Sequence, residues 1–229
     1  MIESVNVIGA RGRVGSAVAA RLADRGVSLR EGDAELILLC VPDRVIVEVA
    51  STIAPGPWVA HVSGGTPLAA LDPHGRRFSL HPLQTFTHDR GPEQLDGAWA
   101  AVTGETEEAR AVANELAVLL GVRPFPLADD LRALYHAGAV IASNYLVTLR
   151  GMAGELLAEA AVPPEALDPL MRRVIDNDFQ LTGPIERGDW ETVERHRATV
   201  AETAPHLLAA YDELARLTAG DTVSLGGRA

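Results

Sequence analysis

Apolar residues follow two different patterns in the two parts of the chain. The first part alternates stretches of helical spacing with short apolar runs, each bounded by glycine, proline or polar residues. These runs predict strands at residues 5–8, 27–29, 36–41, 58–62, 99–103 and 122–127, and a further strand that starts at residue 78 and ends at the His81-Pro82 step. From Asp129 to about Ala219, alanine, leucine and arginine dominate without a strand pattern. We therefore predict an α/β domain with a mostly parallel sheet over residues 1–127, an all-helical domain over 128–219 and a tail over 220–229.

A glycine-rich turn joins the first predicted strand to a helix, in the sequence SVNVIGARGRVGS. Its glycines are spaced three apart, and position 10, where a strict G-x-G-x-x-G motif needs glycine, holds alanine. Glycines let backbone approach a pyrophosphate, and the N–H groups and dipole of a helix N-terminus favour negative charge. The alternative is a turn that binds nothing. If the turn binds a dinucleotide, the residues at its phosphates are Gly9, Ala10, Gly12, Arg13, Val14 and Gly15.

The connection after the second predicted strand is unusually short. In a Rossmann domain the residue at the end of this strand reads the adenosine ribose, and here it is Arg30. Arginine suits a 2′-phosphate and so favours NADP, whereas the following Glu31 could serve the 2′-hydroxyl of NAD, and either could be a solvated turn charge. About five residues separate Arg30 from the run at Leu36, too few for a crossover helix. The usual second helix and third strand are therefore missing, and the adenosine side of the site is reduced.

Composition excludes several classes of function. The chain has 229 residues, 47% hydrophobic, with a net charge of −11, which argues against binding a nucleic-acid backbone. All 20 basic residues are arginine, so lysine Schiff-base or acid–base chemistry is excluded. The lone Cys40 rules out an internal disulfide, and we expect no metal centre. Because no apolar run has the length of a membrane span and no signal peptide is evident, we expect a cytoplasmic protein that does not enter a membrane.

Candidate chemical groups follow three of the predicted strands. Val41-Pro42-Asp43 ends the third strand, and Ser63 follows the fourth, where an open parallel sheet binds its ligands. Thr66-Pro67 after Ser63 is typical of a helix start, with Thr66 as its N-cap, and Ser63 is either a ligand contact or a turn-capping hydroxyl. His81 precedes a proline at a strand end, and it is either a proton-transfer group near neutral pH or a ring that caps a turn.

The helical part carries a second set of candidates. In the first helix, LYHAGAVIASNYL, a rotation of 100° per residue puts His136 and Ser143 on one face, with Asn144 a quarter turn away. These polar groups either face a cleft or bond to neighbouring helices. A later Gly-Pro loop contains Thr182, Arg187 and Asp189. This loop either closes over the site or is a turn held by Arg187 and Asp189, and Asp189 has the position of a helix N-cap.

Three motifs resemble one protein family over most of the chain: HPLQTF from His81, YHAGAVIASNYLVTL from Tyr135 and LTGPIERGD from Leu181. The family comprises inferred oxidoreductases with a Rossmann-like N-terminal domain and a C-terminal domain of unknown function. They are relatives of prephenate dehydrogenase, pyrroline-5-carboxylate reductase and ketopantoate reductase in the 6-phosphogluconate-dehydrogenase-like superfamily. The resemblance implies a Rossmann-like sheet, a helical domain and a homodimer formed through that domain.

The resemblance also implies roles for the candidate residues. It puts the three turn glycines at the pyrophosphate and Val41-Pro42-Asp43 beside the nicotinamide. It puts His81, His136 and Asn144 around the substrate, with Ser143 on the same helix and the loop of Thr182, Arg187 and Asp189 nearby.

The expected function is therefore that of an NAD(P)-dependent oxidoreductase. It would transfer hydride to or from a small carbonyl or imine substrate in a cleft between the domains, with His136 or His81 supplying the proton. NADP is favoured over NAD through Arg30. The shortened adenosine side leaves a second hypothesis: a cofactor-free ligand-binding, regulatory or non-redox protein on the same scaffold. A deazaflavin acting beside NADP is a third, which no residue selects.

Overall fold

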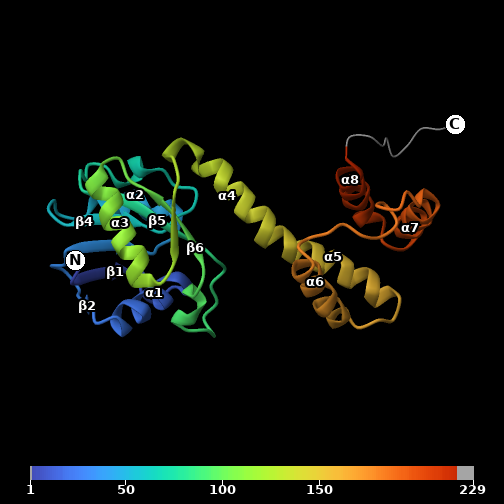
Figure 1. The fold of residues 1–229 in the computed structure, drawn as a ribbon, viewed down its shortest axis with the longest axis horizontal. Helices are drawn as coiled ribbons and strands as arrows, with labels where there is room; N and C mark the ends of the chain where they lie inside the picture. The colour runs from blue at the N-terminus through green and yellow to red at the C-terminus, as the bar shows by residue number, and fades with distance from the viewer. Residues whose placement is uncertain (1, 221–229) are drawn as a thin grey trace. The chain divides into compact units, whose positions relative to one another are not determined.

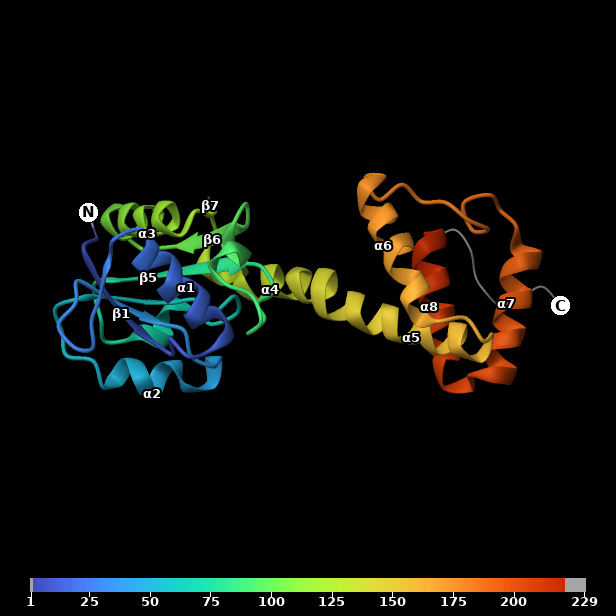
Figure 2. The ribbon, with the colours of Figure 1, turned by 90° about the horizontal axis from the view of Figure 1, so that it is seen from below.

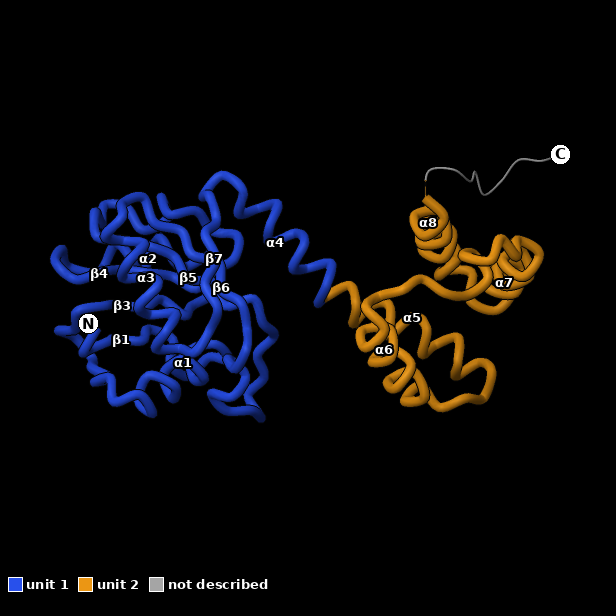
Figure 3. Tube along the Cα trace, viewed as in Figure 1, with its two compact units in different colours: residues 1–143 blue, residues 144–229 orange. Residues whose placement is uncertain are grey.

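The computed structural model describes residues 2–220, and contacts divide the chain into two compact units on either side of the Ser143–Asn144 bond (Figure 3). The first unit therefore includes residues 128–143, which the sequence pattern groups with the helical domain. Most of the predicted tail, from residue 221 onward, lies outside the described residues.

The first unit is built on one seven-stranded sheet (Figure 1). Its order is β2-β1-β3-β4-β5-β6-β7, and every neighbouring pair is parallel except β5 and β6. The strands are β1 (Ser4–Ile8), β2 (Ser28–Leu29), β3 (Leu36–Leu39), β4 (Trp58–His61), β5 (Arg77–Leu83), β6 (Trp99–Thr103) and β7 (Arg123–Pro126). This confirms the predicted Rossmann-like, mostly parallel sheet.

Helices cover both faces of the sheet. On one face α1 (Arg13–Asp24) and α3 (Glu107–Leu120) bury a core with the inward residues of the central strands, because their apolar residues recur at helical spacing. On the other face α2 (Ile46–Ser51), with the 3₁₀ turns η1 (Asp43–Val45) and η2 (Leu68–Leu71), buries a second, smaller core. Figure 2 shows α2 on the side of the sheet away from α3. Two further 3₁₀ turns, η3 (Pro92–Leu95) and η4 (Asp129–Leu131), complete this unit.

The missing crossover is explained by the length of β2. This strand has two residues, paired with Ser4 and Val5, and β3 begins at the same level, opposite Val5. The chain therefore has to cross only from one side of β1 to the other, roughly 10 Å for two strand spacings. The six residues between β2 and β3 span this without a helix.

A long helical stretch follows the sheet. It begins as α4 (Arg132–Val140), passes through one π-helical segment, η5 (Ile141–Tyr145), and continues as α5 (Leu146–Glu159). The π segment was not predicted from the sequence. A π turn advances by less than 100° per residue, so it changes which face the residues after Val140 occupy.

The second unit is entirely helical in the part that the structure describes. After α5 it contains η6 (Pro164–Ala166), α6 (Leu167–Asp176), α7 (Trp190–Thr203), η7 (Pro205–Leu207) and α8 (Leu208–Ala219). The prediction that Asp189 caps a helix is confirmed, because its side chain accepts a hydrogen bond from the backbone N–H of Thr192 in α7. None of the helices within residues 2–220 has the length and apolar character needed to cross a membrane.

Two local predictions are wrong. Thr66 does not cap a helix: a 3₁₀ turn starts later, at Leu68, and the Thr66 hydroxyl instead bonds Ser63. The strand of His81 does not end at the His-Pro step, because Pro82 pairs within β5 opposite Ala100. Proline lacks only the N–H donor, so a strand can continue through it where that donor is not needed.

The close packing of the glycine turn gives a stability prediction. A Cβ at position 15 would lie 2.1 Å from the carbonyl oxygen of Gly9, so we expect Gly15→Ala to lower the free energy of unfolding by about 3 kcal/mol or more. Gly138→Ala is the control, since no atom lies within 4 Å of a Cβ there and alanine favours the helix by up to ~1 kcal/mol. Urea unfolding measures both, and equal effects would contradict the packing argument.

Candidate functional site

The glycine turn fits a diphosphate. Gly12 is the N-cap of α1, no side chain caps the first turn, and that turn contains no acidic residue, so its N–H groups and dipole face outward uncompensated. Gly9 has a φ of +94°, and a Cβ there would lie 2.3 Å from the carbonyl oxygen of Cys40 in the strand-end segment after β3. Ala10 and Arg13 are exposed beside the turn, whereas Val14 packs against the core.

The three glycines therefore have separate roles. Gly9 and Gly15 are required for close contact between the turn, β3 and α1. At Gly12 a Cβ would come no closer than 3.2 Å to its nearest neighbour, the carbonyl oxygen of Gly9. Gly12 is thus the position where the absence of a side chain leaves backbone accessible to a ligand.

The end of β3 lies against this turn. A Cβ at Gly9 would also come within 3.3 Å of Val41 Cγ1, so Val41 borders the cradle directly. Pro42 then turns the chain into η1, and the exposed Asp43 starts that turn. The hydroxyl of Ser63 donates a hydrogen bond of 2.8 Å to Asp43 Oδ2, which joins the end of β3 to the end of β4.

Ser63 is the central residue of the turn after β4. Its Oγ accepts hydrogen bonds from the backbone N–H groups of Gly65 (3.3 Å) and Thr66 (3.0 Å). Its own N–H donates to Nδ1 of the fully buried His61, 3.2 Å away. Ser63 therefore acts at least as a turn-capping group, one of the two roles considered from the sequence.

The buried Cys40 thiol has a pKa raised to about 12 by burial, so it is unreactive at neutral pH.

His81 lies beyond the carboxyl end of the neighbouring strand, β4. In the pairing of β4 with β5, the last residue of β4, His61, lies opposite Ser79. His81 is two residues further along β5, about 7 Å beyond that end. This brings its ring beside the turn after β4: a Cβ at Gly64 would lie 2.9 Å from both Cε1 and Nε2 of His81.

The first turns of α4 supply the rest of the site. The rings of His136 and His81 meet edge to face, with centroids 6.0 Å apart. A Cβ at Gly64 would lie 2.8 Å from His136 Cδ2, and one at Gly65 would lie 3.1 Å from His136 Nδ1. The two imidazoles therefore converge on the Gly64-Gly65 turn, where a side chain at position 64 would displace both rings. Tyr135 adds a hydrogen bond of 2.7 Å between its hydroxyl and His81 Nδ1.

Arg132 anchors α4 to the sheet. Its side chain is 1% exposed; one terminal nitrogen donates to the carbonyl oxygen of Ser63 and the other to Thr103 Oγ1 at 2.9 Å. Its Nε has no hydrogen-bond partner among the described residues, and the nearest carboxylate, Asp129, is 3.9 Å away. Asp129 instead accepts from the N–H of Leu68. The guanidinium is therefore a buried positive charge that is only weakly neutralised.

This environment keeps two histidines neutral. Burial is the main cause that lowers the pKa of His81 to about 4, and the charges of His136 and Arg132 add to it. Burial, with Arg132, lowers the pKa of His61 to about 3. Burial also raises the pKa of Tyr135 to about 12. At neutral pH the site thus presents the neutral rings of His61 and His81 and the intact phenol of Tyr135.

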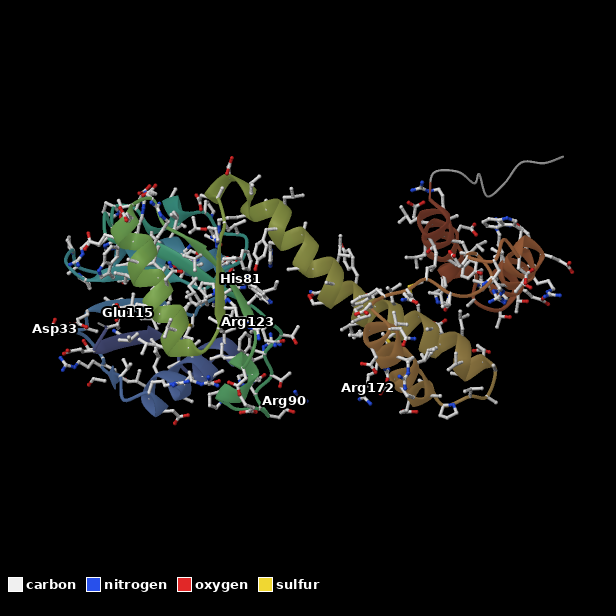
Figure 4. All side chains as sticks on the ribbon, in the orientation of Figure 1. Asp33, His81, Arg90, Glu115, Arg123 and Arg172 are labelled. Atoms are coloured by element: carbon white, nitrogen blue, oxygen red, sulfur yellow. The ribbon has the colours of Figure 1, made fainter. Side chains whose placement is uncertain are left out.

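The other predicted site residues lie elsewhere. The backbone N–H of Arg30 donates to the carbonyl oxygen of Val5, three residues before Ile8, which forms the last pair of β1 with β3. Its side chain lines a cavity of about 930 Å³ with Glu35, Trp58 and Arg76. Asp33 and Glu115 also line this cavity, and Figure 4 shows both on the side of the first unit away from His81.

The remaining candidates belong to the π segment and the second unit. Ser143 Oγ donates to the carbonyl oxygen of Ala139 at 2.7 Å. Asn144 also lies in η5, and Thr182, Arg187 and Asp189 lie between α6 and α7. Their predicted contacts with substrate stay predictions.

Sequence reasoning did not select Arg132 or Tyr135 as site residues. Both precede His136 on α4, and Arg132 is four residues before it, on the same helix face. That spacing was the available signal. It was insufficient because the partners of the two side chains, Thr103, Ser63 and His81, come from other elements.

Comparison with known proteins identifies relatives at two levels. A family model described as a domain of unknown function, DUF2520, matches residues 98–218. No curated protein sequence matches the chain.

Solved structures share the fold over nearly the whole chain. A proposed NADP oxidoreductase from Bacteroides fragilis is 19% identical, with a TM-score of 0.79 over 95% of this chain and 98% of its own. Protein TM1727 from Thermotoga maritima is 26% identical, with a TM-score of 0.76 and coverage of 94% and 98%. An NADH-preferring ketol-acid reductoisomerase from an uncultured archaeon is 15% identical, with a TM-score of 0.64 and coverage of 95% and 82%.

The lowered histidine pKa values predict acid sensitivity. His61 and His81 titrate below their usual 6.5, so the unfolded chain binds more protons between about pH 6.5 and 4. Their contribution to stability is present above pH 6.5 and is lost as the pH falls through this window. We expect a loss of about 2 kcal/mol for each ring between pH 7 and pH 5, measured by urea unfolding.

Variants of single histidines test which ring causes this loss of stability. His81→Gln should reduce the pH dependence between pH 7 and pH 5 by about half, because only His61 then contributes. His88→Gln, at an exposed position, is the matched control and should leave the slope unchanged. The same slope in all three proteins would refute the assignment.

Proposed function

Because the chain belongs to the DUF2520 family and has the fold of NAD(P)-dependent oxidoreductases, we propose that it is such an enzyme, acting on a small carbonyl or imine substrate. The observation that carries the proposal is a continuous series of contacts along one edge of the sheet. It runs from the glycine turn through Val41, Asp43 and Ser63 to the two histidine rings. A dinucleotide cradle and acid–base groups are thus adjacent.

Different residues of the chain would bind different parts of the cofactor. The N–H groups at the start of α1 would hold the diphosphate, with Gly12 allowing its approach. Val41, Pro42 and Asp43 would border the nicotinamide, which when bound supplies or accepts hydride. One of the structural neighbours, pyrroline carboxylate reductase from Plasmodium falciparum, was solved with NADP bound, and another prefers NADH. The proposal therefore covers both cofactors; the NADP preference predicted from Arg30 is not supported by its position, because Arg30 lines a separate cavity.

The two imidazoles have different capacities. His81, with a pKa of about 4, carries no extra proton at neutral pH, so its ring can donate a hydrogen bond to a substrate oxygen or nitrogen but is a poor general acid. His136 is the adjacent ring that would transfer the proton to the product alkoxide or amine. With no lysine in the chain, no side-chain ammonium group competes for this role.

Cofactor binding tests the proposal. We expect NADPH or NADH to bind in a calorimetric titration with micromolar affinity, and Gly12→Asp to abolish binding through its bulk and its negative charge. Gly75→Asp is the matched control: it introduces the same charge at an exposed glycine with no atom within 4 Å of a Cβ, and it should bind normally. The comparison of the two cofactors also tests the NADP preference.

The two-residue β2 favours one alternative, a cofactor-free ligand-binding, regulatory or non-redox protein. Such a protein would keep the histidine pair but would bind neither nicotinamide. Absence of binding for both cofactors to the folded wild-type protein would therefore favour the alternative and refute the oxidoreductase.

We also propose that the protein is a homodimer formed through its helical unit. Large apolar side chains are exposed along α6 and after it, including Leu170 (61%), Ile175 (54%) and Phe179 (72%). Exposed apolar groups gathered on one segment are typical of an interface between subunits.

Light scattering coupled to gel filtration tests this association. We expect the wild-type protein to have the mass of a dimer and Leu170→Glu to weaken the dimer at least about tenfold, since it removes apolar burial in both copies. Val118→Glu, at a 72% exposed position on α3, is the control and should remain dimeric. A wild-type monomer would contradict the proposal.

A further inference from the structure

Tyr135 contacts the Nδ1 atom of His81, whereas the Nε2 atom of the same ring faces the Gly64-Gly65 turn. Its hydroxyl lies 2.7 Å from Nδ1, and the rings meet edge to face with centroids 5.5 Å apart. Tyr135 also packs edge-on against Phe125, at 5.9 Å, and Phe125 contacts Trp99. The phenol ring is therefore held by an aromatic cluster that its hydroxyl does not contribute to.

The direction of this hydrogen bond follows from the chemistry of the two groups. Both are neutral near pH 7, because burial disfavours the phenolate and the imidazolium. A neutral pair shares one proton between O and N. The phenol is the stronger acid and the unprotonated imidazole nitrogen the stronger acceptor, so the O–H of Tyr135 donates to Nδ1. The ring proton of His81 must then lie on Nε2.

Nε2 is the atom that reaches the candidate site. It has no hydrogen-bond partner among residues 2–220, and it is accessible to solvent. It lies at the Gly64 side, where the ring of His136 also converges. A proton on Nε2 makes this atom a hydrogen-bond donor toward a bound molecule, whereas a proton on Nδ1 would make it an acceptor.

The surroundings maintain this state over the physiological pH range. The charged groups that act on His81 are the guanidinium of Arg132 and the carboxylate of Asp43, and the His136 ring lies beside it. The neutral His61 ends the neighbouring strand β4. The buried guanidinium of Arg132 opposes a second proton on the ring. Asp43 acts in the other direction with a smaller effect.

We propose that Tyr135 is a positioning residue that fixes His81 as the Nε2–H tautomer, so that His81 donates a hydrogen bond to the reacting oxygen or nitrogen of the substrate. The part that concerns substrate rests on the proposed oxidoreductase function. The part that concerns the tautomer does not, because it depends only on the Tyr135–His81 pair. Polarising the acceptor atom and delivering the proton are thus assigned to different imidazoles, His81 and His136.

The tautomer is tested by ¹⁵N NMR of histidine-labelled protein at pH 7, without cofactor or substrate. His81→Asn identifies the His81 signals by their loss. We expect wild-type His81 to show a protonated Nε2 and an unprotonated, hydrogen-bonded Nδ1. A protonated Nδ1 in the wild-type protein would overturn the proposal, and this measurement needs no variant of Tyr135 to fold.

Tyr135→Phe then tests the cause. It keeps the aromatic packing and removes only the hydroxyl, so the His81 Nδ1 signal should move toward that of a ring exchanging between tautomers. Tyr145→Phe, at the exposed tyrosine of η5, should leave the signals unchanged. An unaltered His81 spectrum in folded Tyr135→Phe would show that the hydroxyl does not fix the tautomer.

Kinetics extend the test if a turnover assay is established. Tyr135→Phe should lower kcat about tenfold, the value of one hydrogen bond, with little change in the KM for cofactor. An unchanged kcat alongside a changed NMR spectrum would refute the role of His81 toward substrate while leaving the tautomer assignment intact. Absence of cofactor binding, by contrast, would refute the proposed function without altering the NMR result.

Discussion

The buried guanidinium of Arg132 is the interaction on which the candidate site depends. It binds the carbonyl oxygen of Ser63 and the hydroxyl of Thr103, so it fixes the start of α4 to the ends of β4 and β6 together. Tyr135 and His136 lie on the same helical turns, and their positions against His81 follow from that anchor. Because the nearest carboxylate is 3.9 Å away, the positive charge also acts electrostatically on the histidines.

That arrangement combines rigidity with a particular protonation state. A buried cation close to imidazoles opposes their protonation, and burial acts in the same direction. The Gly64-Gly65 turn completes the site by leaving space for both rings. The result is a histidine pair in which one ring is held neutral and hydrogen-bonded to a phenol, linked through Ser63, Asp43 and Val41 to a helix N-terminus suited to a diphosphate.

The side of the site at β2, where an adenosine would bind, has fewer residues available for binding. The two-residue β2 lets the chain return to β3 without a helix, and the residues that would bind an adenosine are correspondingly few. Arg30, the residue expected there, lies at the level of the middle of β1 and lines a separate cavity. The diphosphate and nicotinamide sides are therefore the better-supported parts of the cofactor proposal.

Local pattern in the sequence was sufficient for the elements of the fold. The short apolar runs predicted all seven strands, the G-x-x-G-x-x-G turn predicted the junction of β1 with α1, and the missing residues after Arg30 predicted the missing crossover. These features are local, because strand and helix periodicity and turn chemistry act over a few residues. His81 and His136 were also recognised as candidates from their positions within motifs.

The tertiary structure alone decided how those candidates act. Because β5 continues past the last residue of β4, His81 lies beyond the edge of that strand. The sequence of β5 does not specify where β4 ends, so this position could not be predicted. Arg132 and Tyr135 gained their roles from partners on β4, β5 and β6, and Thr66 lost its predicted cap to Ser63. A hydrogen bond or a pKa depends on which groups meet across the fold and how far water is excluded, and periodicity along the chain carries no information about either.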